Sequence, residues 1–150
     1  ARWPGVIPAG SVSHEPAMNI DIYPTLTRLA GSRLPTSHVV DGKNILPLLA
    51  NGENTPHEAL LLFNNDRIAG VRSGRWKLVV ESFYRTAISS FDNASSYYAP
   101  NGLLFDLEKD PSETYSYTRE NPSVATRLQK LLEAGQEEFS SAVLPDMWNR

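Results

Sequence analysis

The sequence predicts an α+β fold in which a four-stranded antiparallel sheet packs against one long C-terminal helix. The middle of the chain holds short β-rich runs, and most of them are separated by short turns, which favours antiparallel pairing. Near its end, one long stretch carries apolar residues at helical spacing and predicts the helix that covers the sheet. The first part of the chain, about fifty residues, has the pattern of short helices joined by loops.

Length and composition are those of an ordinary globular protein. Of its 150 residues, 41% are hydrophobic, which is enough to bury a core. The net charge of −3 is weak and dispersed, which argues against a nucleic-acid or acidic-membrane partner because phosphates bind clustered Lys and Arg. The absence of cysteine excludes disulfides, zinc-thiolate sites and thiol nucleophiles from this sequence. No apolar run has the length of a membrane span.

Two helices are predicted in the first part of the chain. Residues 19–31 form the first, with Asp21 as a candidate N-cap and Gly31 at its C-terminal stop. Residues 45–50 form the second, shorter helix. An apolar stripe at helical spacing, typical of a buried face, consists of Ile22, Leu26, Leu29 and Ala30.

Four strands are predicted in the second part. Residues 59–63 are a nearly continuous apolar run, which is typical of a strand covered on both faces. Residues 68–82 form a hairpin that turns at Gly74, because glycine accepts a positive φ. Residues 103–107 form the fourth strand, after a long excursion over 83–101. One face of the hairpin's second strand is expected to carry Trp76, Leu78 and Val80.

The last helix is predicted to begin at Asn121 and Pro122, as N-cap and first helical residue. Gly135 lies inside it at a cost of about 1 kcal/mol relative to alanine, which predicts close packing or fraying there. Residues 143–150 are expected to be a loose tail. The apolar face of the helix is predicted to consist of Val124, Leu128, Leu131, Leu132, Gly135 and Phe139.

Residues with the chemistry of an active site are sparse. The three histidines stand in loop-like contexts without metal-ligand spacing, so surface or capping roles are expected. Acidic side chains near the fourth strand suggest calcium, but they lack the spacing of an EF-hand, and a solvated turn is the simpler interpretation. Basic side chains on the hairpin can either grip an anion or be solvated or paired. The three sets are His14, His38 and His57; Asp106, Glu108, Asp110 and Glu113; and Arg72, Arg75 and Lys77.

Five segments in this order and spacing closely resemble the C-terminal part of sulfatases, which include the arylsulfatases and belong to the alkaline-phosphatase-like superfamily. The segments are RWPG, DIYPTLTRLAG, DGKNILPLL, VRSGRWKL and LLFDLEKDPSE. The resemblance covers nearly the whole chain. It implies that residues 1–52 are the tail end of an N-terminal α/β domain whose main part lies upstream, and that residues 53–150 are the C-terminal subdomain.

The resemblance also implies where the chemistry lies. The family uses a formylglycine, made from Cys or Ser in a C/S-x-P-x-R motif, and a calcium ion, and this sequence contains no such motif. Both cofactors are therefore expected in the missing N-terminal part, which becomes this chain's main partner. The chain alone is expected to be inactive, while the longer protein hydrolyses the sulfate esters of small molecules or glycans. Family members are often exported, so a periplasmic, secreted or lysosomal location is the expectation.

One contribution to substrate selection is expected from the excursion between the third and fourth strands. Its aromatic side chains can stack on a sugar or aryl group, and its arginine can bind a second anion. The substrate-binding candidates are Tyr84, Arg85, Tyr97, Tyr98 and Asn101. Two alternatives stay open at this point. The chain could be a free-standing carbohydrate-binding module, or the same fragment of a phosphonate or phosphate-ester hydrolase of the superfamily.

Overall fold

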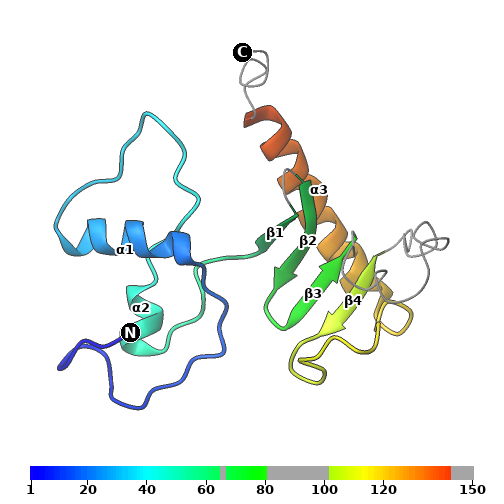
Figure 1. The fold of residues 1–150 in the computed structure, drawn as a ribbon, viewed down its shortest axis with the longest axis horizontal. Coiled ribbons are helices and arrows are strands. Elements are labelled where there is room, and N and C mark those ends of the chain that lie inside the picture. Colours follow the sequence, from blue (N-terminus) through cyan, green and yellow to red (C-terminus); the bar gives the residue numbers. More distant parts are fainter. Residues whose placement is uncertain (65–66, 81–101, 143–150) are drawn as a thin grey trace. The chain divides into compact units, whose positions relative to one another are not determined.

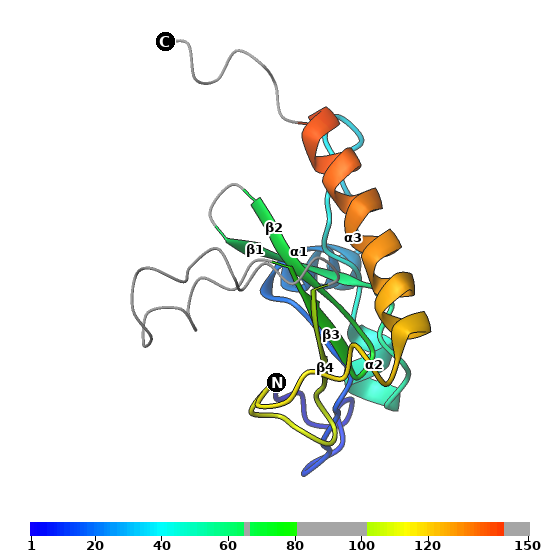
Figure 2. The same ribbon diagram turned by 90° about the vertical axis from the view of Figure 1, so that its right-hand side faces the viewer.

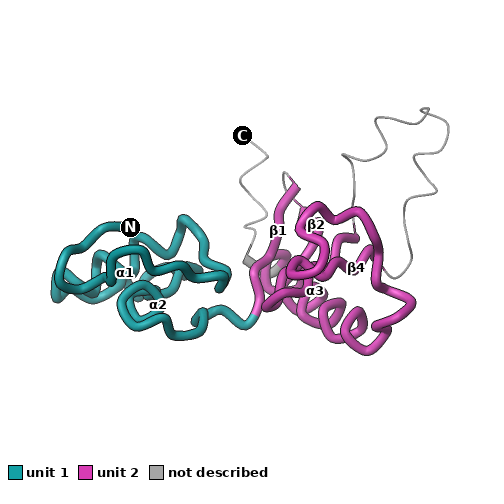
Figure 3. Tube along the Cα trace, turned by 90° about the horizontal axis from the view of Figure 1, so that it is seen from below, with its two compact units in different colours: residues 1–58 teal, residues 59–150 magenta. Residues whose placement is uncertain are grey.

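The computed structural model describes residues 1–64, 67–80 and 102–142, and the chain divides into two compact units. Unit 1 is residues 1–58 and unit 2 is residues 59–150 (Figure 3). Unit 1 contains helices and loops, while unit 2 contains the sheet and the long helix (Figure 1). The predicted excursion over 83–101 and the tail over 143–150 lie outside the described residues.

Unit 1 has two short helices close to the predicted positions. A 3-10 turn over Asn19–Asp21 leads into α1, Ile22–Leu29, and the chain then turns at Gly31, whose φ is 69°. Helix α2, Leu46–Asn51, ends at Gly52 in the left-handed conformation, where the Gly52 N–H donates to the carbonyl of Leu48. Glycine stops both helices because it adopts a positive φ at little cost.

The apolar stripe of α1 is exposed in this chain, although such a stripe typically forms a buried face; the resemblance to sulfatases predicts this exposure, because the stripe would face the sheet of the upstream domain. Ile22, Leu26 and Leu29 are 55%, 59% and 40% exposed. The buried side of the helix consists of Asp21, Pro24 and Thr25. A helix normally buries its apolar stripe. In α1 a polar side makes the contacts within unit 1, because it supplies hydrogen bonds to neighbouring segments, and the apolar side has no cover.

Unit 2 has the predicted α+β fold. Its sheet has the order β1-β2-β3-β4, with every neighbouring pair antiparallel. Helix α3 lies along one face of this sheet (Figure 2). The elements are β1, Leu60–Asn64; β2, Arg67–Ser73; β3, Trp76–Val79; β4, Leu103–Asp106; and α3, Pro122–Ala142.

The hairpin of β2 and β3 turns as predicted, with Gly74 at φ 55°. A bulge in β2, where Leu62 pairs with Gly70 but Phe63 pairs with Ile68, adds one residue to the strand. Since a bulge shifts the two-residue alternation by one, Ile68 and Val71 both face the core.

The core of unit 2 lies between the sheet and α3. Leu78 is fully buried, with Trp76 and Val80 packed against the same cluster, which confirms the predicted face of β3. The predicted face of α3 is confirmed as well, since Leu128 and Leu132 are buried in the cluster. The buried members of the cluster are Ile68, Val71, Leu78, Leu104, Ala125, Leu128 and Leu132.

The first and last strands are the edges of the sheet. The prediction that β1 is covered on both faces is wrong at Phe63, which is 51% exposed and meets Phe139 of α3 edge-to-face at 5.2 Å. An apolar run alone does not distinguish an edge strand from a central one. The outer edge of β4 is capped, because the Leu104 N–H donates to Thr118 Oγ1 and the Tyr117 N–H donates to the Leu104 carbonyl.

Candidate functional site

The predicted substrate-binding residues lie outside the described part of the chain. Tyr84, Arg85, Tyr97, Tyr98 and Asn101 all belong to the segment 81–101, which the structure does not describe. Their role therefore stays a prediction. The polar centre that the described residues do form lies elsewhere, in unit 1, around a carboxylate that the sequence suggests only as a helix cap.

Asp21 is fully buried and accepts three hydrogen bonds from three separate segments. The Met18 N–H donates to Oδ2 at 2.8 Å, the Lys43 N–H donates to Oδ1 at 2.8 Å, and His57 Nε2 lies 2.8 Å from Oδ1. Because an ionised carboxylate only accepts, the proton of this last bond is on Nε2. Asp21 thus joins residues that lie up to 36 positions away in the sequence.

The charge of Asp21 is stabilised in place by its donors. Burial by itself would raise the pKa of Asp21, since it disfavours the charged form. The backbone N–H groups of Lys43 and Met18 and the ring of His57 outweigh burial, and the pKa lies below its ordinary value. This carboxylate is therefore ionised at neutral pH although it is fully buried.

A second bridge runs beside the first. Thr25 Oγ1 donates to the Asp21 carbonyl at 2.6 Å and accepts the Ile45 N–H at 3.0 Å. Gly42 also lies close, because a β-carbon on it would lie 2.1 Å from the Ile20 carbonyl oxygen. The loop before α2 is thus held against the start of α1 by backbone contact and by side-chain hydrogen bonds on the polar side of the helix.

The three histidines do not share one role. His14 and His38 are exposed, as expected, but the expectation of a surface or capping role is wrong for His57, whose exposed fraction is 8%. Sequence spacing could not reveal a partner 36 residues away. One signal was available: Asp21 and Thr25 stand at helical spacing on the side of the helix next to the apolar stripe, which indicates a second, polar contact face.

The arrangement supports a structural role for His57 better than a catalytic one. A histidine base must present a ring nitrogen to the group that it deprotonates. In this structure Nε2 is engaged by Asp21 and the ring is buried. The hydroxyl of Thr25 is likewise engaged as donor and acceptor. The hydrogen bonds of Asp21, Thr25 and His57 hold separate segments of unit 1 together.

The charged residues near β4 pair with one another. Arg75 Nη2 lies 3.2 Å from the buried Asp106 Oδ2, without hydrogen-bond geometry, and Nη1 lies 3.3 Å from Glu108 Oε2. Lys77 Nζ lies 2.7 Å from Glu113 Oε1. Arg75 and Lys77 therefore have carboxylates as partners, and Arg72 Nε donates to the Gly74 carbonyl at 3.1 Å, which favours the paired interpretation over an anion site.

The carboxylates near β4 are engaged by protein groups, which leaves few of their oxygens to bind calcium. Asp110 Oδ2 accepts from the N–H and the hydroxyl of Thr114 and from the Tyr115 N–H, as a turn residue does. Within the described ranges, no group of three or more His, Cys, Asp or Glu side chains is placed to hold a metal ion. The residues present do not fit the family's calcium ion.

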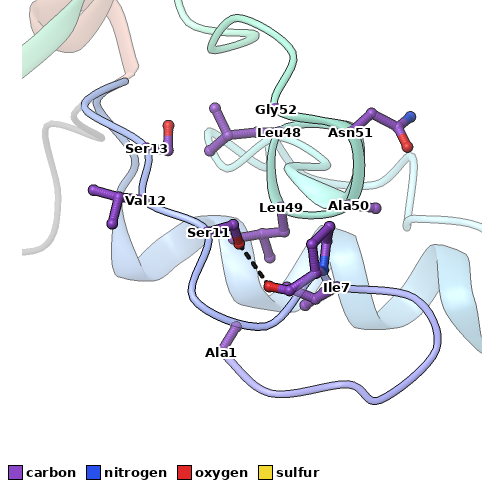
Figure 4. Close-up of a pocket in the computed structure, with 11 residues that line it drawn as sticks. Ala1, Ile7, Ser11, Val12, Ser13, Leu48, Leu49, Ala50, Asn51 and Gly52 are labelled. Carbon is purple, nitrogen blue, oxygen red and sulfur yellow. Dashed lines mark hydrogen bonds between the residues drawn. The ribbon is translucent and has the colours of Figure 1, made fainter.

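A hollow of about 310 Å³ opens in unit 1 between the N-terminal loop and α2. The Ser11 hydroxyl donates to the Pro8 carbonyl at 2.9 Å. Ser11 and Leu49 lie close together in the lining (Figure 4). Ser13 and Asn51 add polar groups to a lining that is otherwise mostly aliphatic. None of the described residues that line the hollow has an acidic, basic or cationic side chain, so we interpret it as a surface groove.

Comparison with known proteins decides the family. Residues 55–146 match the family described as the C-terminal region of aryl-sulfatase. The chain belongs to the sulfatase family. It is 33% identical to arylsulfatase H of Canis lupus familiaris over 96% of this chain and 28% of that protein. It is 35% identical to steryl-sulfatase of Rattus norvegicus over 79% of this chain and 24% of that protein.

Sulfatases also share the fold. A crystal structure of a sulfatase from Pseudoalteromonas sp. matches 89% of this chain and 28% of its own, with a TM-score of 0.72 at 23% identity. The chain thus spans about a quarter of the length of the curated sulfatases that it matches. Family membership favours the C-terminal part of a sulfatase over a free-standing carbohydrate-binding module. In the described ranges no helix is long and apolar enough to cross a bilayer.

Proposed function

We propose that this chain is the C-terminal part of a sulfatase that hydrolyses sulfate esters, and that it is not catalytic alone. The observation that carries the proposal is the match of residues 55–146 to the C-terminal region of aryl-sulfatase, within relatives about four times as long. The formylglycine and calcium of the family would belong to the N-terminal part of the longer protein. In keeping with this, the sequence contains no C/S-x-P-x-R motif from which the formylglycine could be made.

Residues 1–52 of unit 1 would belong to the N-terminal α/β domain, as a helical layer over its sheet. The support is the exposed stripe of α1, since Ile22, Leu26 and Leu29 are the kind of surface that a helix normally buries. Residues 1–52 are the part that we assign to that domain. Residues 53–150 are assigned to the C-terminal subdomain.

The segment between β3 and β4 would shape substrate choice. Tyr84, Tyr97 and Tyr98 would stack on the organic part of a sulfate ester, while Arg85 and Asn101 would bind its polar groups. The support is chemical: aromatic side chains are concentrated in one long connection that also carries an arginine, and long connections in compact domains are often functional.

Activity is tested by comparing the 150-residue chain with the longer protein on p-nitrophenyl sulfate and p-nitrophenyl phosphate. We expect the longer protein to prefer the sulfate and the chain alone to give only the background rate. Hydrolysis by the chain alone would contradict the proposal. A preference of the longer protein for the phosphate would favour the phosphatase branch of the superfamily instead.

The domain assignment is tested with Leu26→Gln. In the chain alone this exposed side chain should tolerate the change, whereas in the longer protein it should lower stability by about 1–3 kcal/mol, because a buried amide would lack partners. Val39→Gln is the control, since Val39 is exposed and lies outside α1. Equal effects of the two changes in the longer protein would refute the assignment.

Substrate selection is tested by Tyr97→Ala and Tyr98→Ala in the longer protein. We expect the ratio of kcat/KM values between an aryl sulfate and a sulfated sugar to change. Tyr115→Ala is the matched control, because Tyr115 is an exposed tyrosine outside the segment. Unchanged ratios in both loop variants would rule out this role.

A further inference from the structure

The segment that connects the two units makes a series of contacts with unit 1. Thr55 is held at two points: its N–H donates to Glu15 Oε2 at 3.0 Å and its hydroxyl donates to the Pro16 carbonyl at 2.7 Å. Lys43 Nζ donates to the Pro56 carbonyl at 3.1 Å. His57 follows directly with its bond to Asp21. Two residues later unit 2 begins at Ala59.

These contacts differ in strength. The bonds from Thr55 to Glu15 and from Lys43 to Pro56 are exposed, where water competes for both partners. The His57–Asp21 bond is buried, at 2.8 Å, and one of its partners carries a full charge. The two exposed bonds also involve a charged group, Glu15 or Lys43, so the difference lies in burial, which excludes the competing water.

We propose that the Asp21–His57 contact is the anchor that fixes the point at which the chain leaves unit 1. With the anchor in place, the free tether between the units is reduced to Glu58 and Ala59, because β1 begins at Leu60. Without it, the contacts of Thr55 with Glu15 and Pro16 and that of Lys43 with Pro56 would have to hold the segment, and the tether would lengthen towards Thr55. His57 is a positioning residue in this account.

Two variants of His57 distinguish loss of the hydrogen bond to Asp21 from a change in side-chain size or polarity. His57→Gln keeps an N–H donor at nearly the position of Nε2, whereas His57→Asn shortens the side chain and withdraws its donor from Asp21. Asp21→Asn removes the charge and one acceptor, so that its amide nitrogen faces a backbone donor. His38→Gln is the control, because His38 is exposed and its Nδ1 shares an exposed hydrogen bond with the neighbouring Ser37.

The readout is limited proteolysis of the full chain by a glutamate-specific endoprotease under native conditions. Glu58 is exposed beside the anchor, and Glu133 lies within α3 of unit 2. We expect cleavage after Glu58 to accelerate roughly 10- to 100-fold in His57→Asn and Asp21→Asn, the factor given by loss of one bond to a charged group. His57→Gln and His38→Gln should stay within about twofold of the wild type on the same scale.

Cleavage after Glu133 reports whether the effect is local. An anchor predicts that it stays unchanged in all four variants while cleavage after Glu58 rises in two of them. A parallel rise at both sites would mean that the pair merely contributes to global stability, and it would overturn the proposal. Equal Glu58 cleavage in His57→Asn and wild type would overturn it as well. The assay needs no enzymatic activity and is therefore independent of the proposed function.

Discussion

A β-carbon on Gly42 would lie only 2.1 Å from the carbonyl oxygen of Ile20, so the two backbones are in direct contact. The φ of Gly42 is not in the left-handed region, so it is the space, not the conformation, that requires glycine. The contact places the Lys43 N–H 2.8 Å from Asp21 Oδ1. Backbone proximity at Gly42 is thus a precondition of the polar centre in unit 1.

Gly42→Ala should destabilise the chain by about 3 kcal/mol, because the new methyl group forces two backbone segments apart and strains the Lys43–Asp21 bond. Gly52→Ala is the comparison: it has open space but a φ of 68°, so only conformational strain of about 1–2 kcal/mol is expected. Denaturant unfolding measures both. The prediction fails if Gly52→Ala costs as much as Gly42→Ala.

Gly135 and Leu61 test close packing between α3 and β1. A β-carbon on Gly135 would lie 2.6 Å from Leu61 Cδ1. We expect Gly135→Ala to destabilise the chain by about 1 kcal/mol, since overpacking exceeds the gain in helix propensity. In a Leu61→Ala background the same change should stabilise by up to about 1 kcal/mol. The same sign in both backgrounds, measured by a double-mutant cycle, would argue against the steric explanation.

Leu128 and Leu26 are leucines on helices with opposite environments. Leu128 is fully buried in the core of unit 2, and Leu128→Ala should cost about 2–5 kcal/mol through lost burial and a cavity. Leu26 is 59% exposed, so Leu26→Ala in the 150-residue chain should cost less than about 1 kcal/mol. Thermal or denaturant unfolding compares them directly. Similar costs would mean that α1 buries its apolar face within this chain.

Acid should weaken the centre around Asp21. Its folded pKa lies below the ordinary value of 3.8, so its contribution to stability is fully present above about pH 5 and is lost as the pH falls through the folded pKa. The stability difference between wild type and Asp21→Asn should therefore be large near pH 5 and shrink below about pH 4. The other ionisable groups that contact this region are His57, Lys43 and Glu15. A stability difference between wild type and Asp21→Asn that stays constant over this pH range would contradict the assignment.

Local patterns predicted most of unit 2. The turn at Gly74 follows from the conformational freedom of glycine. The inward face of β3 and the apolar face of α3 follow from periodicity, which depends on neighbours a few residues apart. The bulge that turns both Ile68 and Val71 inward was not predictable, because it depends on the register with β1. The exposure of Phe63 was missed for a related reason, since edge position is a property of the whole sheet.

The sequence by itself determined the fold class, the sulfatase resemblance and the apolar character of the stripe on α1. Each of these depends on which residues occur at which spacing along the chain. Only the tertiary structure decided that Asp21, Thr25 and His57 form a buried polar centre. The physical reason is distance. The Asp21 carboxylate bonds to whichever donors lie near it in the folded chain. Local periodicity cannot reveal His57 as one of them, because it lies 36 residues away in the sequence.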